Sequence, residues 1–246
     1  MIFGILCTLA AICSMGCSRN PEPETITGFY FDTFISITLY QEITPEIREE
    51  VLTLCETYEN MFSAEIEGSD IYNINHAKGE AVTVNPETID LLQTAVYYAD
   101  LTKGKCDPTI YPVSSLWDFS SGNNTIPEDN LLREKLSHVN YQNILVHENT
   151  VTLKDPKAAI DLGFIAKGYI ADKLKEYFLS KDITRGIINL GGNILTLNSK
   201  PDGTPYRIGI EYPFQHQSLP ILTLQISDES VVTSGVYQRY FMFNDT

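Results

Sequence analysis

Apolar residues repeat with helical spacing in three long stretches of the chain. Thr44-Pro45 and Asn85-Pro86 each place a capping residue before a proline, which is typical of a helix start, and a third stretch begins at Ile165. Behind each start, apolar side chains return every three or four residues, so one face of each helix is expected to be buried. The expected buried positions are 47, 51, 54, 55, 58, 61 and 62, then 89, 92, 95, 96 and 99, then 165, 166, 169, 170, 174, 177 and 178.

Aromatic and β-branched runs predict strands between these helices. Phe29–Tyr40 is expected to form one strand. Gly186–Leu197 is expected to form another, and the pair Gly191-Gly192 inside it indicates a bulge or a close approach by another group. The segment 63–78 has the character of a loop. Further elements are predicted as a hairpin at 144–146 and 151–153, a short helix at 131–139, strands at 206–211 and 222–226, and two strands around a glycine turn at 231–240.

A turn between a short apolar run and the third helix is a candidate for chemistry. The run Ala158–Ile160 leads into Asp161 and Gly163, and the helix follows directly. The amino end of a helix carries free N–H groups and the positive end of the helix dipole, so this turn suits an anion such as a phosphate. Lys167, in the first helical turn, adds a charged donor. A purely structural unit is the commoner explanation, and the spacing fits neither a dinucleotide-binding nor a P-loop glycine motif.

The composition indicates a globular protein with an acidic surface. Of 246 residues, 43% are hydrophobic and 20% are charged, and the formal net charge is −15. This length allows a substantial core in one large or two small domains. The acidic balance argues against nucleic acid binding through a basic face. The histidines at 76, 138, 147 and 216 have no ligand spacing, so a zinc site is not expected.

The amino-terminal segment has the pattern of an export signal. Its first sixteen residues carry no charge and resemble the apolar region of a signal peptide. Gly16-Cys17 and the polar, proline-rich stretch that follows resemble a bacterial lipobox with its tether. We therefore expect a signal peptide at 1–16, a lipidated tether at 17–27 and a main domain at 28–246, with a plain secretory signal or a disordered apolar end as the alternatives.

Two cysteines remain in the main domain. Cys55 falls on a predicted apolar helix face, so it is expected to be a buried core thiol, and Cys106 stands alone before Asp107-Pro108. They do not form a disulfide framework. An aspartate before proline lies at a fixed corner of the chain, where it usually caps a turn and less often contacts a ligand.

Five segments in order resemble the ApbE family of flavin transferases, and the resemblance runs from about Phe29 to the last residue. It implies an α+β fold in which two β-containing halves, with helices, hold FAD in the cleft between them. It also implies a Mg²⁺-dependent reaction, in which a Ser or Thr hydroxyl of an acceptor flavoprotein attacks the FMN phosphate of FAD and AMP leaves. Many members are exported or lipid-anchored, which agrees with a membrane anchor on Cys17 at the extracytoplasmic face. The segments are Ser69–Asn75, Asp107–Ile110, Asp161–Tyr169, Ile188–Asn193 and Val232–Tyr237.

The same resemblance assigns ligand positions to this chain. Ala166 matches a backbone carbonyl that binds the metal, and Asp107 matches a residue at the flavin–adenine site. The turns Gly191-Gly192 and Ser234-Gly235 match segments that face the ligand. The whole expected FAD site comprises Phe31, Glu65, Lys105, Cys106, Asp107, Gly163, Lys167, Tyr169, Gly191, Gly192, Ser234 and Gly235.

Some positions depart from the family pattern. Phe164 stands where a small residue is common, Cys106 where an aromatic is usual, and Glu65 where many transferases carry a tyrosine. The last position helps to separate transfer from hydrolysis, so the alternatives are an FAD pyrophosphatase that yields FMN and AMP, and a flavin-binding lipoprotein without activity. The family's Asp and Thr metal ligands, and its catalytic residues, are expected beyond Thr246, so we expect the chain to be truncated at its C-terminus.

Overall fold

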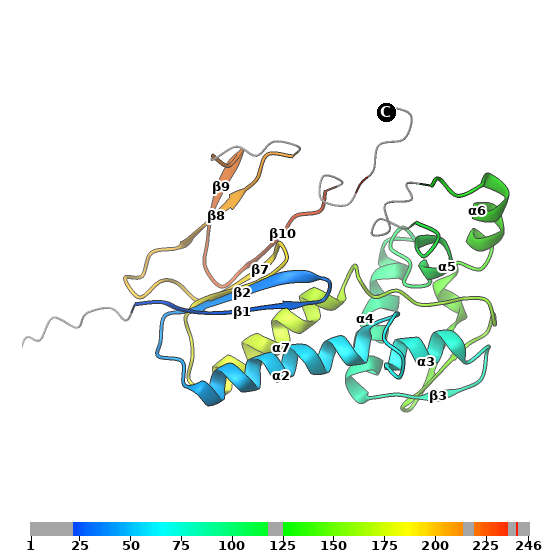
Figure 1. Ribbon diagram of the computed structural model, residues 1–246, viewed down its shortest axis with the longest axis horizontal. Coiled ribbons are helices and arrows are strands. Elements are labelled where there is room, and N and C mark those ends of the chain that lie inside the picture. The colour runs from blue at the N-terminus through cyan, green and yellow to red at the C-terminus, as the bar shows by residue number, and fades with distance from the viewer. Residues whose placement is uncertain (1–21, 118–124, 214–218, 236–239, 241–246) are drawn as a thin grey trace, which may run out of the picture.

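The computed structural model describes residues 22–117, 125–213, 219–235 and 240. The expected signal peptide, Cys17, most of the tether, and Val236-Tyr237 of the fifth motif lie outside these residues. Within them, helices are mixed with antiparallel strands, which confirms the predicted α+β class. Figure 1 shows two parts, a five-stranded sheet with two long helices against one face, and a group of further helices with a small sheet beside it.

The larger sheet has the strand order β1-β2-β6-β7-β10 and is antiparallel throughout. Side chains alternate between its faces, so Ile35 and Ile37 of β2 are fully buried toward the helices while Phe34 is exposed. The strands are β1 (Glu24–Tyr30), β2 (Thr33–Leu39), β6 (Gly186–Leu190), β7 (Asn193–Leu197) and β10 (Ser230–Val232).

Two hairpin turns divide the segments that the sequence predicts as strands at Phe29–Tyr40 and Gly186–Leu197. Phe31-Asp32 joins β1 to β2, Gly191-Gly192 joins β6 to β7, and all four residues have positive φ. Two residues with positive φ give the tight turn whose twist matches that of a hairpin. The prediction of an unbroken strand over Phe29–Tyr40 is therefore wrong, and the interruption predicted at Gly191-Gly192 is a hairpin turn between two strands. Phe-Asp carries no turn signal of its own, and Gly-Gly fits a turn as well as a bulge.

Helices α2 (Pro45–Phe62) and α7 (Ala166–Ser180) lie side by side against the sheet (Figure 1). The Thr44 side chain accepts a hydrogen bond from the N–H of Ile47, so the predicted N-cap of α2 is confirmed. The predicted apolar faces are confirmed as well, and they form one core with the sheet. Their buried members are Val51, Cys55, Tyr58 and Phe62 of α2, and Ile170, Ala171, Leu174 and Phe178 of α7.

The second part contains α4, whose start at Asn85-Pro86 is as predicted, and four short helical segments. Its small antiparallel sheet has the order β3-β5-β4 and includes the predicted hairpin. No helix among the described residues is long and apolar enough to cross a membrane. The elements are α3 (Asp70–His76), β3 (Val82–Thr83), α4 (Pro86–Leu101), α5 (Tyr111–Ser114), α6 (Asp129–Leu136), the 3-10 turn η1 (Tyr141–Asn143), β4 (Ile144–His147) and β5 (Thr150–Leu153).

Helix α3 lies inside the segment that the sequence predicts to be a loop. Ser69 caps it by accepting the N–H of Tyr72 at 3.0 Å, and Ile71 and Ile74 are buried on one face. A helix of seven residues offers only these two inward positions, which is too few to reveal a helical period.

A predicted strand pair covers part of the opposite face of the large sheet. Strands β8 (Tyr206–Ile210) and β9 (Leu222–Ile226) form an antiparallel hairpin. Tyr206, Ile208 and Ile226 form its small buried cluster, which packs against the outward side chains of the large sheet. Those side chains include Tyr40, Ile187, Ile194 and Val231.

Candidate functional site

The turn before α7 is fixed by hydrogen bonds that meet at Asp161. One carboxylate oxygen accepts the N–H of Gly163 at 2.8 Å, and the other accepts the Ser114 hydroxyl at 3.3 Å. The N–H of Asp161 donates to the carbonyl of Pro108 at 2.8 Å. These bonds join the segment around Asp107-Pro108 and helix α5 to the turn, so two of the predicted motif segments are in contact.

Several N–H groups of this turn are already used. Those of Gly163, Ile165 and Ala166 donate to oxygens of the turn itself at 2.8 to 3.0 Å. The expectation of free donors is wrong at these three positions. The Asp161 carboxylate accepts the N–H of Gly163, and the Leu162 carbonyl accepts those of Ile165 and Ala166. What the turn offers an anion is the positive end of the α7 dipole and the side chain of Lys167, which is half-buried.

Asp107 has a structural role in the described part of the chain. Its Oδ1 accepts the N–H and the hydroxyl of Thr109 at 2.8 and 2.6 Å, and its Oδ2 accepts the N–H of Tyr141 at 3.0 Å. This confirms that the aspartate caps a turn, and it also ties that turn to η1. Lys105 and Cys106 next to it are exposed.

Glu65 is hydrogen-bonded to Tyr111 of α5. The Tyr111 hydroxyl donates to Glu65 Oε1 at 2.5 Å, across 46 positions of sequence. Burial, and then the Glu65 carboxylate, raise the pKa of Tyr111 to about 12, so this hydroxyl stays protonated at neutral pH. Glu65 is therefore connected through α5 to the same region as Asp161.

The Gly191-Gly192 turn is closely approached, as one of the two sequence interpretations expects. A Cβ built on Gly191 would lie 2.8 Å from the Cβ of Thr33 and closer still to its hydroxyl. A Cβ added to Gly192 would lie 3.7 Å from the hydroxyl oxygen of Thr233. The exposed Ser234 and Gly235 follow Thr233 in the chain. The tip of the β6–β7 hairpin thus lies against the start of β2 and the residues after β10.

Asn193, at the start of β7, lies close to α7. A Cβ added to Gly168, in the first turn of that helix, would lie 3.8 Å from the side-chain nitrogen of Asn193. The first hairpin is anchored separately, because the N–H of Phe31 donates to Glu59 of α2 at 2.6 Å. The expected site residues in both hairpins and those at the start of α7 are therefore brought to one end of the sheet.

Tyr169 is placed differently from the other predicted residues. Its ring packs edge-on against Tyr58 and Phe62, with centroids 6.3 and 5.7 Å away, and Lys173 lies over it. Burial, followed by a hydrogen bond to Asp90 of α4, raises the pKa of its hydroxyl. These contacts make Tyr169 part of the packing between α2, α4 and α7.

Four residues of this arrangement are absent from the predicted ligand set. Asn75, Ser114, Thr33 and Asn193 each bind or approach a predicted segment through a polar side chain. Asn75 and Asn193 belong to motif segments, which is a signal that the sequence offers. Ser114 and Thr33 have no such sequence signal, because the residues they contact lie far away in the chain.

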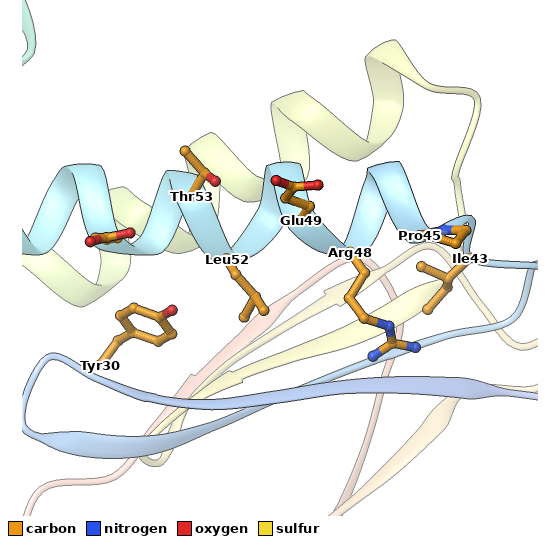
Figure 2. Close-up of a pocket in the computed structure, with 8 residues that line it drawn as sticks. Tyr30, Ile43, Pro45, Arg48, Glu49, Leu52 and Thr53 are labelled. Carbon is orange, nitrogen blue, oxygen red and sulfur yellow. The ribbon is translucent and has the colours of Figure 1, made fainter.

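Two hollows on the described surface lie along α2 and away from the motif segments. One, between α2 and β1, has a volume of about 390 Å³, and Tyr30, Arg48 and Leu52 line its wall (Figure 2). The other, of about 490 Å³, lies between α2 and α7 beside Glu50 and Tyr177. Neither is lined by a residue of the expected FAD site, so we assign no ligand to them.

A model of the ApbE family matches residues 31–246 of the chain. The chain belongs to the ApbE family. Two solved structures are similar in fold. The ApbE protein of Thermotoga maritima has a TM-score of 0.85 and 30% identity over 92% of this chain and 74% of that one. The flavin transferase ApbE of Vibrio cholerae has a TM-score of 0.80 and 25% identity, over 90% of this chain and 74% of its own.

Two relatives of this ApbE protein are named FAD:protein FMN transferase. The one from Klebsiella pneumoniae (strain 342) is 33% identical over 198 residues, which cover 79% of this chain and 61% of the relative. The one from Treponema pallidum (strain Nichols) is 29% identical over 257 residues, covering 96% and 71%. The predicted family and fold are confirmed. Because the chain spans 61% of the length of the first relative, the activity of the whole protein is a proposal.

Proposed function

We propose that this ApbE protein transfers FMN from FAD to a Ser or Thr hydroxyl of an acceptor flavoprotein and releases AMP. The observation that carries the proposal is its membership of a family whose relatives are named for this reaction. Support comes from the meeting of the motif segments at one end of the sheet, around the Asp161 turn.

The reaction exchanges one bond to phosphorus for another. The acceptor oxygen bonds to the phosphorus of the FMN phosphate, and the bond from that phosphorus to the bridging oxygen breaks, so AMP leaves with this oxygen. The hydroxyl proton is lost to a base in the same step. The positive end of α7 and the Lys167 ammonium suit the negative charge of the pyrophosphate before and during the transfer.

We propose that the reaction uses Mg²⁺, on the family resemblance and the place of Ala166 at the first position of α7. Within the ranges that the structure describes, no three His, Cys, Asp or Glu side chains form a group that could hold a metal ion. Both Asp161 carboxylate oxygens accept hydrogen bonds from the protein. The described residues do not by themselves fit a complete metal site, and no step above is derived through the ion.

Hydrolysis of FAD to FMN and AMP is the second candidate, and Glu65 is the observation that favours it. A carboxylate that is already hydrogen-bonded to Tyr111 occupies the position where many transferases have a tyrosine ring. In hydrolysis, a water oxygen would bond to the phosphorus of the FMN phosphate in place of the acceptor oxygen, and AMP would leave in the same way.

Incubation of the full-length protein with FAD, Mg²⁺ and an acceptor domain tests these proposals. A transferase adds FMN covalently to the acceptor, which mass spectrometry detects, and forms one AMP for each acceptor labelled. A pyrophosphatase forms AMP and free FMN at the same rate with or without the acceptor. Recovery of unchanged FAD would contradict both. Glu65→Tyr is the informative variant, because it should shift the products from free FMN toward labelled acceptor.

We further propose that the protein works at the extracytoplasmic face of the membrane, anchored by lipid on Cys17. The support is the uncharged first sixteen residues and Gly16-Cys17 with the polar tether behind them. Acceptor flavoproteins exported by the same cell would then meet the enzyme there.

A further inference from the structure

We propose that Asn75 is a positioning residue for the FAD phosphates, and that it acts on the Asp161 turn through Ile160. The inference rests on the proposed function for its ligand and on hydrogen bonds for its geometry. Asn75 lies in the last turn of α3, and 85 positions separate it from Ile160.

The Asn75 amide satisfies both backbone groups of Ile160. Its Oδ1 accepts the Ile160 N–H at 2.6 Å, and its Nδ2 donates to the Ile160 carbonyl at 2.9 Å. Ile160 is fully buried, so neither backbone group has access to water. Loss of the amide would leave a buried donor and a buried acceptor unpaired, which is a costly state.

No described strand covers residues 154–165. Backbone contacts to other segments hold both ends of this stretch: Lys154 N–H donates to the Asn143 carbonyl, Ala159 bridges to Ile110, and Asp161 N–H donates to the Pro108 carbonyl. The two bonds from Asn75 add a side-chain anchor at Ile160 itself. A side-chain amide reproduces the donor and acceptor of a peptide group.

The position of Ile160 sets the position of the anion-facing turn. Asp161 follows it directly, holds the N–H of Gly163 and is bonded to Pro108. The helix that carries Lys167 begins five residues after Asp161, at Ala166. A shift of about 1 Å at such a support can cost about 100-fold in a reaction that depends on alignment.

Helix α3 offers a matched control. Asn73 has the same side chain two positions earlier, but it is exposed and its Nδ2 donates to the carbonyl of Gly68, just before α3, at 3.1 Å. Asn73→Leu should therefore leave the turn as it is. A second control, Leu91→Ala in the core of α4, destabilises the fold and removes no hydrogen bond of the turn.

The test combines FAD titration, steady-state kinetics and hydrogen exchange on the purified full-length protein. For Asn75→Leu we expect the FAD dissociation constant and the KM for FAD to rise about tenfold. This is the order of change expected when the two buried hydrogen bonds to Ile160 are lost. The KM for the acceptor should not change. Amide exchange should quicken in a peptide covering 158–166 and stay the same in α2. Asn75→Asp keeps the acceptor for the Ile160 N–H but sets a carboxylate oxygen against the Ile160 carbonyl, so it should not restore the affinity for FAD.

The outcomes separate this inference from the proposed function. An unaltered chain that binds no FAD would overturn the proposed function. Normal FAD affinity in Asn75→Leu, in a chain that does bind FAD, would overturn the positioning role alone. Equal losses in Leu91→Ala and Asn75→Leu would also overturn it, because general destabilisation would then explain the effect.

Discussion

At the scale of single residues, the tip of the β6–β7 hairpin leaves no space for a side chain at Gly191. Its φ is +64°, and a Cβ there would overlap Thr33. We expect Gly191→Ala to lower the free energy of unfolding by about 2–5 kcal/mol, from the left-handed conformation and the overlap together. Chemical denaturation measures this.

Gly203 provides the control for that substitution. It also has positive φ, at +81°, but no atom lies within 4 Å of an added Cβ. Gly203→Ala should cost only the conformational part, about 1–2 kcal/mol. Equal losses at the two glycines would show that the Thr33 contact is unimportant.

Lys167 is the residue whose charge we expect to bind the FAD phosphates. Lys167→Ala should weaken FAD binding by about 1.5–3 kcal/mol, the value of a hydrogen bond to a charged group. Titration of FAD against both proteins decides it. Unchanged affinity in Lys167→Ala would remove this residue from the site.

Cys55 and Cys106 differ in accessibility, and this gives a pH-dependent prediction. Cys55 is fully buried and Cys106 is exposed. Burial, followed by the charge of Glu59, raises the pKa of Cys55 from 9.0 to about 12. Its contribution to stability is therefore complete below pH 9 and is lost as the pH rises from 9 toward 12.

Alkylation at pH 8, followed by peptide mass spectrometry, tests the accessibility directly. Cys106 should react in the folded protein, whereas Cys55 should react only after denaturant is added. Fast labelling of Cys55 in the folded protein would contradict its place in the core.

At the scale of elements, one carboxylate joins two helices. Asp70 Oδ2 accepts the N–H and the side-chain amide of Asn85 at 2.9 and 3.0 Å, and the hydroxyl of Thr88 at 2.5 Å. Asn85 makes no side-chain cap bond of its own, so Asp70 in the first turn of α3 supports the start of α4. This arrangement fixes α3, and with it Asn75, relative to α4.

We expect Asp70→Ala to lower the free energy of unfolding by about 1.5–3 kcal/mol, the range for bonds to a charged group. The comparison is Thr44→Ala, which removes an ordinary N-cap from α2 and should cost about 1 kcal/mol. Thermal and urea denaturation of both variants provide the measurement. A smaller loss for Asp70→Ala than for Thr44→Ala would show that the inter-helix bonds contribute little.

At the scale of the whole molecule, the expected site is assembled from both parts of the fold. The hairpin tips come from the large sheet, and α3, α5 and the Asp161 turn come from the second part. Helix α7 connects them, since its first turns lie beside Asn193 of β7 and its start follows the Asp161 turn. The residues expected to form the site thus lie where the two parts meet.

The predicted lipid anchor belongs to this scale too. Cys17→Ser should release the protein from the membrane fraction while the purified enzyme keeps its activity, because residue 17 precedes the domain that carries the motifs. Two acyl chains give stable anchoring that one does not. Fractionation and mass spectrometry of the mature N-terminus provide the readout, and an unmodified Cys17 in cytosolic protein would contradict the proposal.

The sequence alone determined the long helices, most strands and the family. The apolar repeats of α2, α4 and α7 and the caps at Thr44-Pro45 and Asn85-Pro86 are local signals, so they are readable without a structure. Five motif segments in order were enough to indicate ApbE. The short α3 and the turn at Phe31-Asp32 were not readable, because too few residues carry their pattern.

Only the tertiary structure decided how the candidate site is held together. Asn75 meets Ile160, Glu65 meets Tyr111, and Thr33 excludes a side chain at Gly191, each across tens of positions. The structure also shows that three N–H groups of the Asp161 turn, expected to be free, donate hydrogen bonds within the turn. Hydrogen bonds between distant segments depend on how the whole chain folds. The local periodicity of apolar residues does not predict which distant segments come into contact.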